Sequence, residues 1–419
     1  MLKKAKVGIL ISAIICILMI LGACGSDTPA AQPTTQQSTV QQPASTDEPV
    51  NLTLWHYYTA TAPHLQSVID SFNSQQNGVY VQLEFVPFAD ISRQLSIGLA
   101  GNVLPDLAII DTVATANFAN IGVLKDITDT VQASGEFEHF LEGPRGANRL
   151  NGRYFGIPVE ANALGFFYNT DIFDAVGIQA LPETWNELLE VSARVLEHDS
   201  SLIPVGITAV RNEQSTFHFI PFLYSAGGTF DNLASPEAAR TLTFFKELMD
   251  NGYMSPDFIN QNQDDIIQRF IAGQVAMMIN GPWAVPRLED VNFNVGLVPR
   301  DVRHASVLGG ANMVAVDGAN ADAAMEVINF FLQRSTVEAF AEGASLLPIR
   351  TDMMAEPRWQ QDPSAMFFSG NLAVAVPRGP SPHWPQVSEN IQIAIQSALL
   401  GQQTPEDALA QAAAANAGF

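Results

Sequence analysis

Aromatic and acidic side chains stand directly after two short apolar runs in this sequence. The first run ends at Trp55 and is followed by His56, Tyr57 and Tyr58, and the second run is followed by Asp111. An aromatic face can pack against the C–H face of a pyranose, and a carboxylate can accept hydrogen bonds from fixed hydroxyl groups. This pairing of residue types is suited to binding a polyhydroxylated small molecule.

Other chemistry lacks its sequence signature. There is no phosphate-binding glycine loop, no G-x-S-x-G turn and no H-E-x-x-H helix, and the seven histidines are scattered without metal-ligand spacing. We therefore predict no catalytic residues, no metal and no cofactor. A pair of carboxylates for glycoside hydrolysis stays open at this point, because such a pair is defined in space and not by spacing in the sequence.

The first third of the folded chain predicts alternating strands and helices. Strands are expected at 51–55, 79–85 and 107–110. One helix is expected from Pro63 up to the stop signal Asn77-Gly78, and another at 91–100. The first helix shows its buried face at Leu65, Val68, Ile69 and Phe72, with the spacing of an amphipathic helix. Strand, helix, strand, helix, strand is the order of an α/β domain, in which ligands bind beyond the carboxyl ends of the strands.

The rest of the chain continues the same alternation. Thr184 to Glu187 fits a capping box, and Ser235-Pro236 and Thr404-Pro405 fit helix starts. The patterns predict helices at 185–196, 236–250, 266–271, 387–400 and from 405, one long helix at 322–343, and a buried strand at 275–279. Two α/β domains fit this length.

The amino terminus reads as a secretory signal. Lys3, Lys4 and Lys6 precede an apolar run at 7–21, which is short for a membrane span, and the end Leu-Gly-Ala-Cys24 resembles a bacterial lipobox. That resemblance implies a signal peptide at 1–23 and a lipid on Cys24. Residues 24–49 are rich in Ser, Thr, Gln, Pro and Ala and predict a disordered tether.

Charge and composition limit the classes of molecule that this protein can bind. The formal net charge is −23, and no basic cluster follows the signal, so nucleic acid is excluded as a partner. The acidity also disfavours an anionic ligand. Cys16 and Cys24 both fall within or at the end of the signal, so the mature chain has no internal cysteine pair. No second apolar run is long enough for a permease.

Five segments, in order, resemble the family 1 extracellular solute-binding proteins, which include maltodextrin and oligosaccharide binders. They are LTLWHYYT at 52–59, GNVLPDLAIID at 101–111, NGRYFGIPVEANALGFFYNTDIFDAVGI with LPETWNELL at 151–189, GQVAMMINGPWAV at 273–285 and GGANMVAV at 309–316. The resemblance extends over nearly all of 50–409. Each segment alone is a weak signal, and five in order are a strong one.

The resemblance implies an α/β, two-lobed periplasmic-binding-protein-like fold of the class II type, with discontinuous lobes, hinge crossings and an interlobe ligand cleft. Lobe 1 is expected at 50–160 plus 282–317, and lobe 2 at 161–281 plus 318–419. The chain is expected to cross between lobes near 159–164, 280–283 and 309–319. Closure of such a hinge around a ligand is a two-state change that a transporter can distinguish.

The candidate ligand contacts follow from these positions, each with a structural role as its rival. Aromatic stacking is expected above all from Trp283, and backbone donors from the glycines. The candidates are His56, Tyr57, Tyr58, Asp111, Glu160, Asn162, Trp283, Gly309, Gly310, Asn312 and Trp384. Because neighbours in a strand face opposite ways, at least one of the residues at the end of the first strand should belong to the core.

The expected function is capture of a mono- or oligosaccharide for an ABC importer, at the extracellular face of the cell membrane. The partners implied are permease subunits, a cytoplasmic ATPase and the membrane itself through Cys24, with the chain acting as a monomer. One alternative is a glycerol phosphate or polyamine ligand, for which Arg153, Arg350 and Arg378 need inspection. Another is a surface protein or enzyme that holds polysaccharide.

Overall fold

The computed structural model describes residues 48–101, 103–344, 346–361 and 363–419. The predicted signal peptide, Cys24 and nearly all of the predicted tether lie outside the described residues. Within the described part of the chain, no helix is both long and apolar enough to cross a membrane.

The first lobe is built on a six-stranded sheet. Its strands are β1 (Val50–His56), β2 (Val79–Phe85), β3 (Leu107–Asp111), β6 (Ile157–Ala163), β11 (Ser306–Ala315) and β12 (Ala375–Val376), in the order β12-β11-β3-β1-β2 with β6 also paired to β11. Strands β1, β2 and β3 are parallel, whereas β11 runs antiparallel to β3 and β6. The side chains of β3 are fully buried from Leu107 to Ile110, as expected for a strand covered on both faces.

Helices from both ends of the chain cover this sheet. One face is packed by α1 (Ala62–Gln75), α4 (Thr128–Ser134), α11 (Ala321–Leu332) and α12 (Arg334–Ala344), and the other by α2 (Phe88–Gly101) and α3 (Thr115–Asn120). Two apolar clusters result, one on each side of the sheet. The predicted strands and helices of the first third of the chain are confirmed.

The second lobe has a four-stranded sheet with its own core. Its order is β10-β7-β9-β8, from β7 (Gly165–Asn169), β8 (Ile203–Gly206), β9 (Val275–Asn280) and β10 (Phe293–Gly296). The helices around it are α6 (Thr170–Val176), α7 (Trp185–His198), α8 (Glu213–Ser225), α9 (Pro236–Asp250), α10 (Gln263–Ile271), α16 (Trp384–Leu399) and α17 (Pro405–Asn416). The capping box predicted at Thr184 is present at the start of α7.

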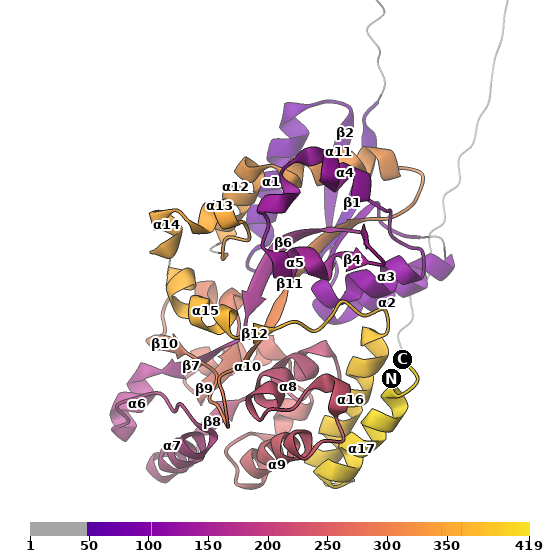
Figure 1. Ribbon diagram of the computed structural model, residues 1–419. Coiled ribbons are helices and arrows are strands. Elements are labelled where there is room, and N and C mark those ends of the chain that lie inside the picture. Colours follow the sequence, from indigo (N-terminus) through magenta and orange to yellow (C-terminus); the bar gives the residue numbers. More distant parts are fainter. Residues whose placement is uncertain (1–47, 102, 345, 362) are drawn as a thin grey trace, which may run out of the picture. The chain divides into compact units, whose positions relative to one another are not determined.

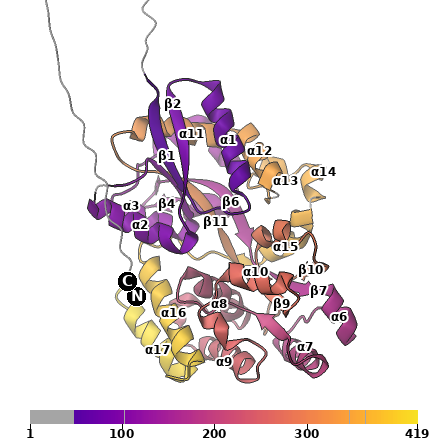
Figure 2. The same cartoon turned by 180° about the vertical axis from the view of Figure 1, so that it is seen from behind.

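Three stretches of chain connect the lobes. Strands β6 and β11 pair antiparallel in the first sheet and extend from it toward the second lobe, as both views show (Figure 1, Figure 2). The third stretch contains α15 (Pro363–Ala373) and β12 and leads into α16. Two of the expected crossings, near 159–164 and 309–319, are therefore found at β6 and β11. The crossing expected near 280–283 is not found. The chain there passes from β9 into the short helix η5 (Pro282–Arg287), which packs in the second lobe.

Two other expectations need correction. The single helix expected at 322–343 is two helices, because Gln333 adopts an extended backbone between α11 and α12. The break lets α11 lie on the sheet while α12 packs on α1. Both helices join the core of the first lobe, whereas the sequence predicts 318–419 in the second lobe. Strand β10 pairs with β7 of the second lobe, whereas the sequence predicts 282–317 in the first lobe.

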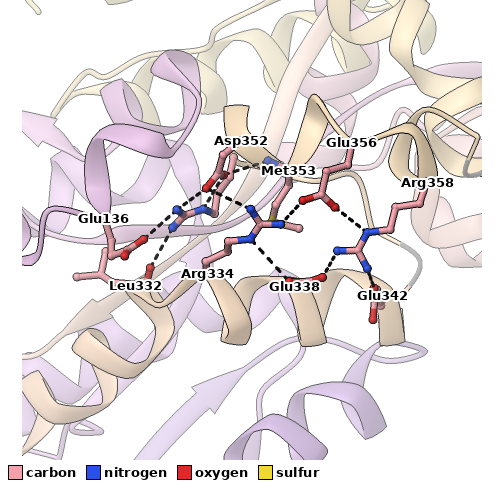
Figure 3. A network of polar contacts seen from close by, with 10 residues as sticks. Glu136, Leu332, Arg334, Glu338, Glu342, Asp352, Met353, Glu356 and Arg358 are labelled. Carbon is pink, nitrogen blue, oxygen red and sulfur yellow. Dashed lines mark hydrogen bonds and ion pairs between the residues drawn. The ribbon is translucent and has the colours of Figure 1, made fainter.

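A network of ion pairs joins the segments after α12 to the rest of the first lobe (Figure 3). Arg350 is 1% exposed and pairs with Glu136 and Asp352 at 2.8 and 2.9 Å, with its guanidinium 5.3 Å from the centre of the Phe140 ring. Arg334 and Arg358 extend the network over the surface. Their partners are Glu338, Glu342, Asp352 and Glu356.

The buried and the exposed arginines of this network should contribute differently to the stability of the protein. Arg350→Met is expected to lower the free energy of unfolding by about 2–3 kcal/mol, because it leaves two carboxylates without their buried partner. Arg358→Met, at 45% exposure, should cost about 1 kcal/mol or less despite its three acidic partners. Urea unfolding of the two variants compares them directly, and equal losses would contradict this assignment.

Candidate functional site

A cavity of about 250 Å³ is lined by residues of both lobes and of the crossings between them. Its size lies near the lower end of small-molecule sites, which measure roughly 300–1,000 Å³. Eight of the eleven candidates from the sequence line it, namely Tyr57, Tyr58, Asp111, Glu160, Asn162, Trp283, Gly309 and Gly310. This arrangement places the cavity beyond the carboxyl ends of β1 and β3, where open α/β sheets bind ligands.

Aromatic rings form two opposing parts of the wall. From the first lobe come Tyr57 and Phe88, with ring centres 5.1 Å apart in an edge contact. From the second lobe come Trp283 and Phe217, 6.5 Å apart and tilted by 31°. A side chain at Gly281 would collide with the indole of Trp283, since an added Cβ would lie 2.1 Å from that ring. Gly281 is therefore what allows Trp283 its present position.

The two hinge strands supply the polar floor. Glu160 and Asn162 lie two residues apart on β6, and the Glu160 Oε1 accepts a hydrogen bond of 2.7 Å from the Asn162 amide. Burial raises the pKa of Glu160, against the opposing effect of the hydrogen bond from Asn162. The Asn162 Oδ1 is buried and has no hydrogen-bond partner among the described residues. An unpaired buried acceptor favours a ligand that supplies the missing hydrogen bond.

Gly309 and Gly310 face these residues from β11. Gly309 lies opposite Asn162 in the strand register, and an added Cβ would approach the Asn162 Oδ1 to 2.2 Å. Gly310 has φ of +140° and lies against the Glu160 carbonyl. Both positions thus require glycine. A Cβ would collide with Asn162 and Phe217 at Gly309 and with the Glu160 backbone at Gly310, where the positive φ also disfavours a side chain.

An ion-pair cluster joins the lobes at the cavity wall. Arg378, from the third crossing, donates to both carboxylate oxygens of Asp111 at 2.8 and 3.1 Å, and to Glu213 at 2.6 Å. Asp111 belongs to the first lobe and Glu213 to the second. The guanidinium also stacks 4.4 Å from the centre of the Phe217 ring. Arg378 is 3% exposed, so these contacts act with little screening by water.

Two helices of the second lobe begin at the cavity. Asn212 caps α8 and Asn262 caps α10, which makes Glu213 and Gln263 the first residues of their helices. The positive end of each helix dipole therefore lies at this wall and favours the carboxylates gathered there. Glu213 also accepts hydrogen bonds from Ser388 at 2.5 Å and from the Trp384 indole at 3.1 Å.

Three candidates from the sequence do not line the cavity. His56 is buried at the end of β1 with its ring 5.9 Å from that of Phe85. Asn312 bonds to Thr115 and Asn148 within the first lobe. Trp384 is 2% exposed and reaches the site only through Glu213.

Several lining residues are absent from the candidates, notably Glu213, Phe217, Gln263 and Phe88. Glu213 and Gln263 follow asparagines that are typical helix caps, and this cap signal marks two helix starts that could meet at a cleft. The sequence suggests Arg378 as a possible ligand contact, but no local pattern predicts that it pairs with Asp111 and Glu213 from different lobes.

A buried histidine behind the wall makes stability depend on pH. Burial lowers the pKa of His218 to about 3, so the unfolded chain, with its ordinary histidine value, binds the proton more tightly. Stability from this group is complete above about pH 6.5 and decreases as the pH falls. Between pH 7 and pH 5 the loss should be about 2 kcal/mol. Urea unfolding at both pH values should show a smaller loss in His218→Asn, and an equal loss would refute the prediction.

Comparison with known proteins places the chain in a family. Residues 67–367 match the family model described as bacterial extracellular solute-binding protein, so the chain belongs to that family. The resemblance carried by the five segments is thereby confirmed.

Individual relatives agree on fold. The solute-binding protein of Thermotoga lettingae bound with alpha-D-tagatose is 26% identical, covers 87% of this chain and 98% of its own, and superposes with a TM-score of 0.81. Maltose-bound MalE3 of T. maritima is 23% identical, covers 87% of this chain and 98% of its own, and superposes with a TM-score of 0.80. The maltotriose-binding protein of Pyrococcus abyssi is 24% identical over 83% of this chain and 77% of its own. The two-lobed solute-binding fold expected from the sequence is confirmed.

Proposed function

We propose that this protein captures a mono- or oligosaccharide between its lobes for a bacterial ABC importer. The observation that carries the proposal is the cavity itself, in which aromatic faces from both lobes flank a floor of buried, partly unpaired hydrogen-bonding groups. Such a combination suits a ligand with apolar C–H faces and many hydroxyls. The relatives named above are described with tagatose, maltose and maltotriose.

The three arginines that a phosphate ligand could use give it little support. Arg350 is held by Glu136 and Asp352 in the first lobe, and Arg153 is an exposed partner of Asp126. Arg378 is the one basic residue among the described residues that line the cavity, and Asp111 and Glu213 already occupy it. The carboxylates of the wall leave a polyamine as the second candidate.

Thermal unfolding of the full chain in mild detergent tests the ligand class. Tagatose, maltose, maltotriose, glycerol phosphate and putrescine are added separately, each well above its expected dissociation constant. A ligand that binds only the folded chain stabilises it by about 2.7 kcal/mol at a hundredfold excess over Kd. We expect a shift with at least one sugar. If only putrescine or glycerol phosphate raises the unfolding temperature, that compound replaces the sugar as the proposed ligand class. If no sugar raises the unfolding temperature, the proposal is rejected.

The location is part of the same proposal. The family is extracellular, and the signal segment ending at Cys24 supports a lipid anchor on the outer face of the cell membrane. Cys24→Ala should move the protein from the membrane fraction, and retention of the variant at the membrane would reject the anchor. Permease subunits and an ATPase are the partners that an importer requires, with the chain acting as a monomer.

A further inference from the structure

His218 is a fully buried residue of α8 with one ring nitrogen already committed as an acceptor. Its Nδ1 accepts the backbone N–H of Thr208 at 3.2 Å. A backbone amide can only donate, so Nδ1 carries no proton. An uncharged imidazole must then hold its proton on Nε2, and that nitrogen becomes a donor.

The partner of this donor is the side chain of Gln263, whose amide lies 2.8 Å from the His218 Nε2. With the amide nitrogen turned toward His218, two N–H groups would face each other. Rotation of the carboxamide by half a turn leaves its shape unchanged and gives Nε2–H an oxygen acceptor. The hydrogen bonds therefore fix the Gln263 Oε1 toward His218 and its NH₂ group on the other side.

Gln263 itself cannot move far from this place. Its backbone N–H donates to the Gln214 side chain at 2.8 Å, its carbonyl accepts from Asn280, and it is the first residue of α10. It is 8% exposed and lines the cavity between the lobes.

We propose that the Gln263 NH₂ group is a specificity-determining hydrogen-bond donor of the ligand site, and that His218 is the residue that orients it. The inference rests on the proposed function, since it names one contact of that same site. The carboxylates of Asp111, Glu160 and Glu213 can only accept when ionised, so hydroxyl protons have many partners in this cavity. Gln263 adds a donor for a sugar oxygen that has no proton, such as a ring or glycosidic oxygen.

The proton on His218 can be observed without a ligand. A long-range ¹H–¹⁵N spectrum of the histidine-labelled full chain distinguishes the two ring nitrogens. We expect His218 to be protonated at Nε2 and unprotonated at Nδ1. A proton on Nδ1 would overturn the proposal, because the Gln263 amide would then be oriented the other way.

The ligand contact is tested by replacing the donor with an acceptor of the same shape. Gln263→Glu keeps an oxygen for the His218 Nε2–H but removes the NH₂ group. Gln214→Glu adds the same charge to the same wall and keeps the acceptor of the Gln263 N–H, so it measures the effect of charge alone. Binding is measured by calorimetry with a sugar that stabilises the protein in the thermal unfolding experiment. Gln263→Glu should weaken binding about tenfold more than Gln214→Glu does.

The positioning role of His218 has its own variant. His218→Asn can accept from the Thr208 N–H through its Oδ1, but its side chain is too short to place a donor where the His218 Nε2 lies. The Gln263 amide should then lose its single orientation, and affinity should fall several-fold. Equal affinities of the Gln263→Glu and Gln214→Glu variants would overturn the inference and leave sugar binding intact. A wild-type protein that binds no sugar would instead reject the proposed function, and the inference with it.

Discussion

Arg378→Met is expected to destabilise the protein by about 3–5 kcal/mol, more than Arg350→Met or any replacement on the surface of the first lobe. The variant keeps a side chain of similar length but removes the guanidinium that lies between Asp111 and Glu213. Both carboxylates are largely buried, at 13% and 19% exposure, so water cannot replace the lost contacts. Urea unfolding at pH 7 measures the loss.

Two further measurements identify the cause of that loss. Adding Glu213→Gln to Arg378→Met removes one uncompensated charge while keeping an acceptor for the Trp384 indole, so the double variant should recover part of the stability. The single variant should also lose less stability than the wild type when the pH falls from 7 to 5, because the buried Glu213 carboxylate, without its arginine, takes up a proton more readily when folded. A double variant less stable than Arg378→Met would contradict the charge argument.

Trp283→Ala is expected to weaken sugar binding by about 10–100-fold, which corresponds to roughly 1.5–3 kcal/mol of lost apolar contact. The indole is half-buried at the cavity wall and is held over Gly281 beside Phe217. Because it lies at the edge of the second-lobe core, its removal should change stability far less than it changes affinity. Calorimetry measures the affinity, and urea unfolding measures the stability.

Trp283→Phe is the matched control, because it keeps an aromatic face of smaller area and should lose less affinity than the alanine variant. Gly281→Ala should also weaken binding although Trp283 itself is unchanged, since the new Cβ displaces the indole. Unchanged affinity in Trp283→Ala would remove this residue from the site.

Local patterns predict the elements well where periodicity and caps agree. The stripe from Leu65 to Phe72 and the capping box at Thr184 are both found as helices with those residues in place. The break at Gln333 is not predicted, because the apolar stripe continues through it, from Phe331 to Val337 and Phe340. Packing of the two helices on different partners, the sheet and α1, requires the break, and that packing lies outside the local sequence.

The site is predictable where a residue follows a strand or lies near a crossing, as Asp111, Glu160 and Trp283 do. His56 is a candidate because it follows an apolar run, but the strand extends through it and buries its side chain. Arg378 could not be placed, since its partners lie 267 and 165 residues away in the sequence. Gln263 could not be recognised as a donor either, because that depends on a proton held by His218.

The late position of β11 has a consequence for the order in which the protein is made. Strand β6 pairs with β11, and β3 lies between β1 on one side and β11 on the other. Until the ribosome has passed residue 315, the first sheet lacks its central partner, and α16 and α17 of the second lobe come later still. Neither lobe can complete its core early in synthesis, so most of the chain remains without its final fold until synthesis is nearly finished.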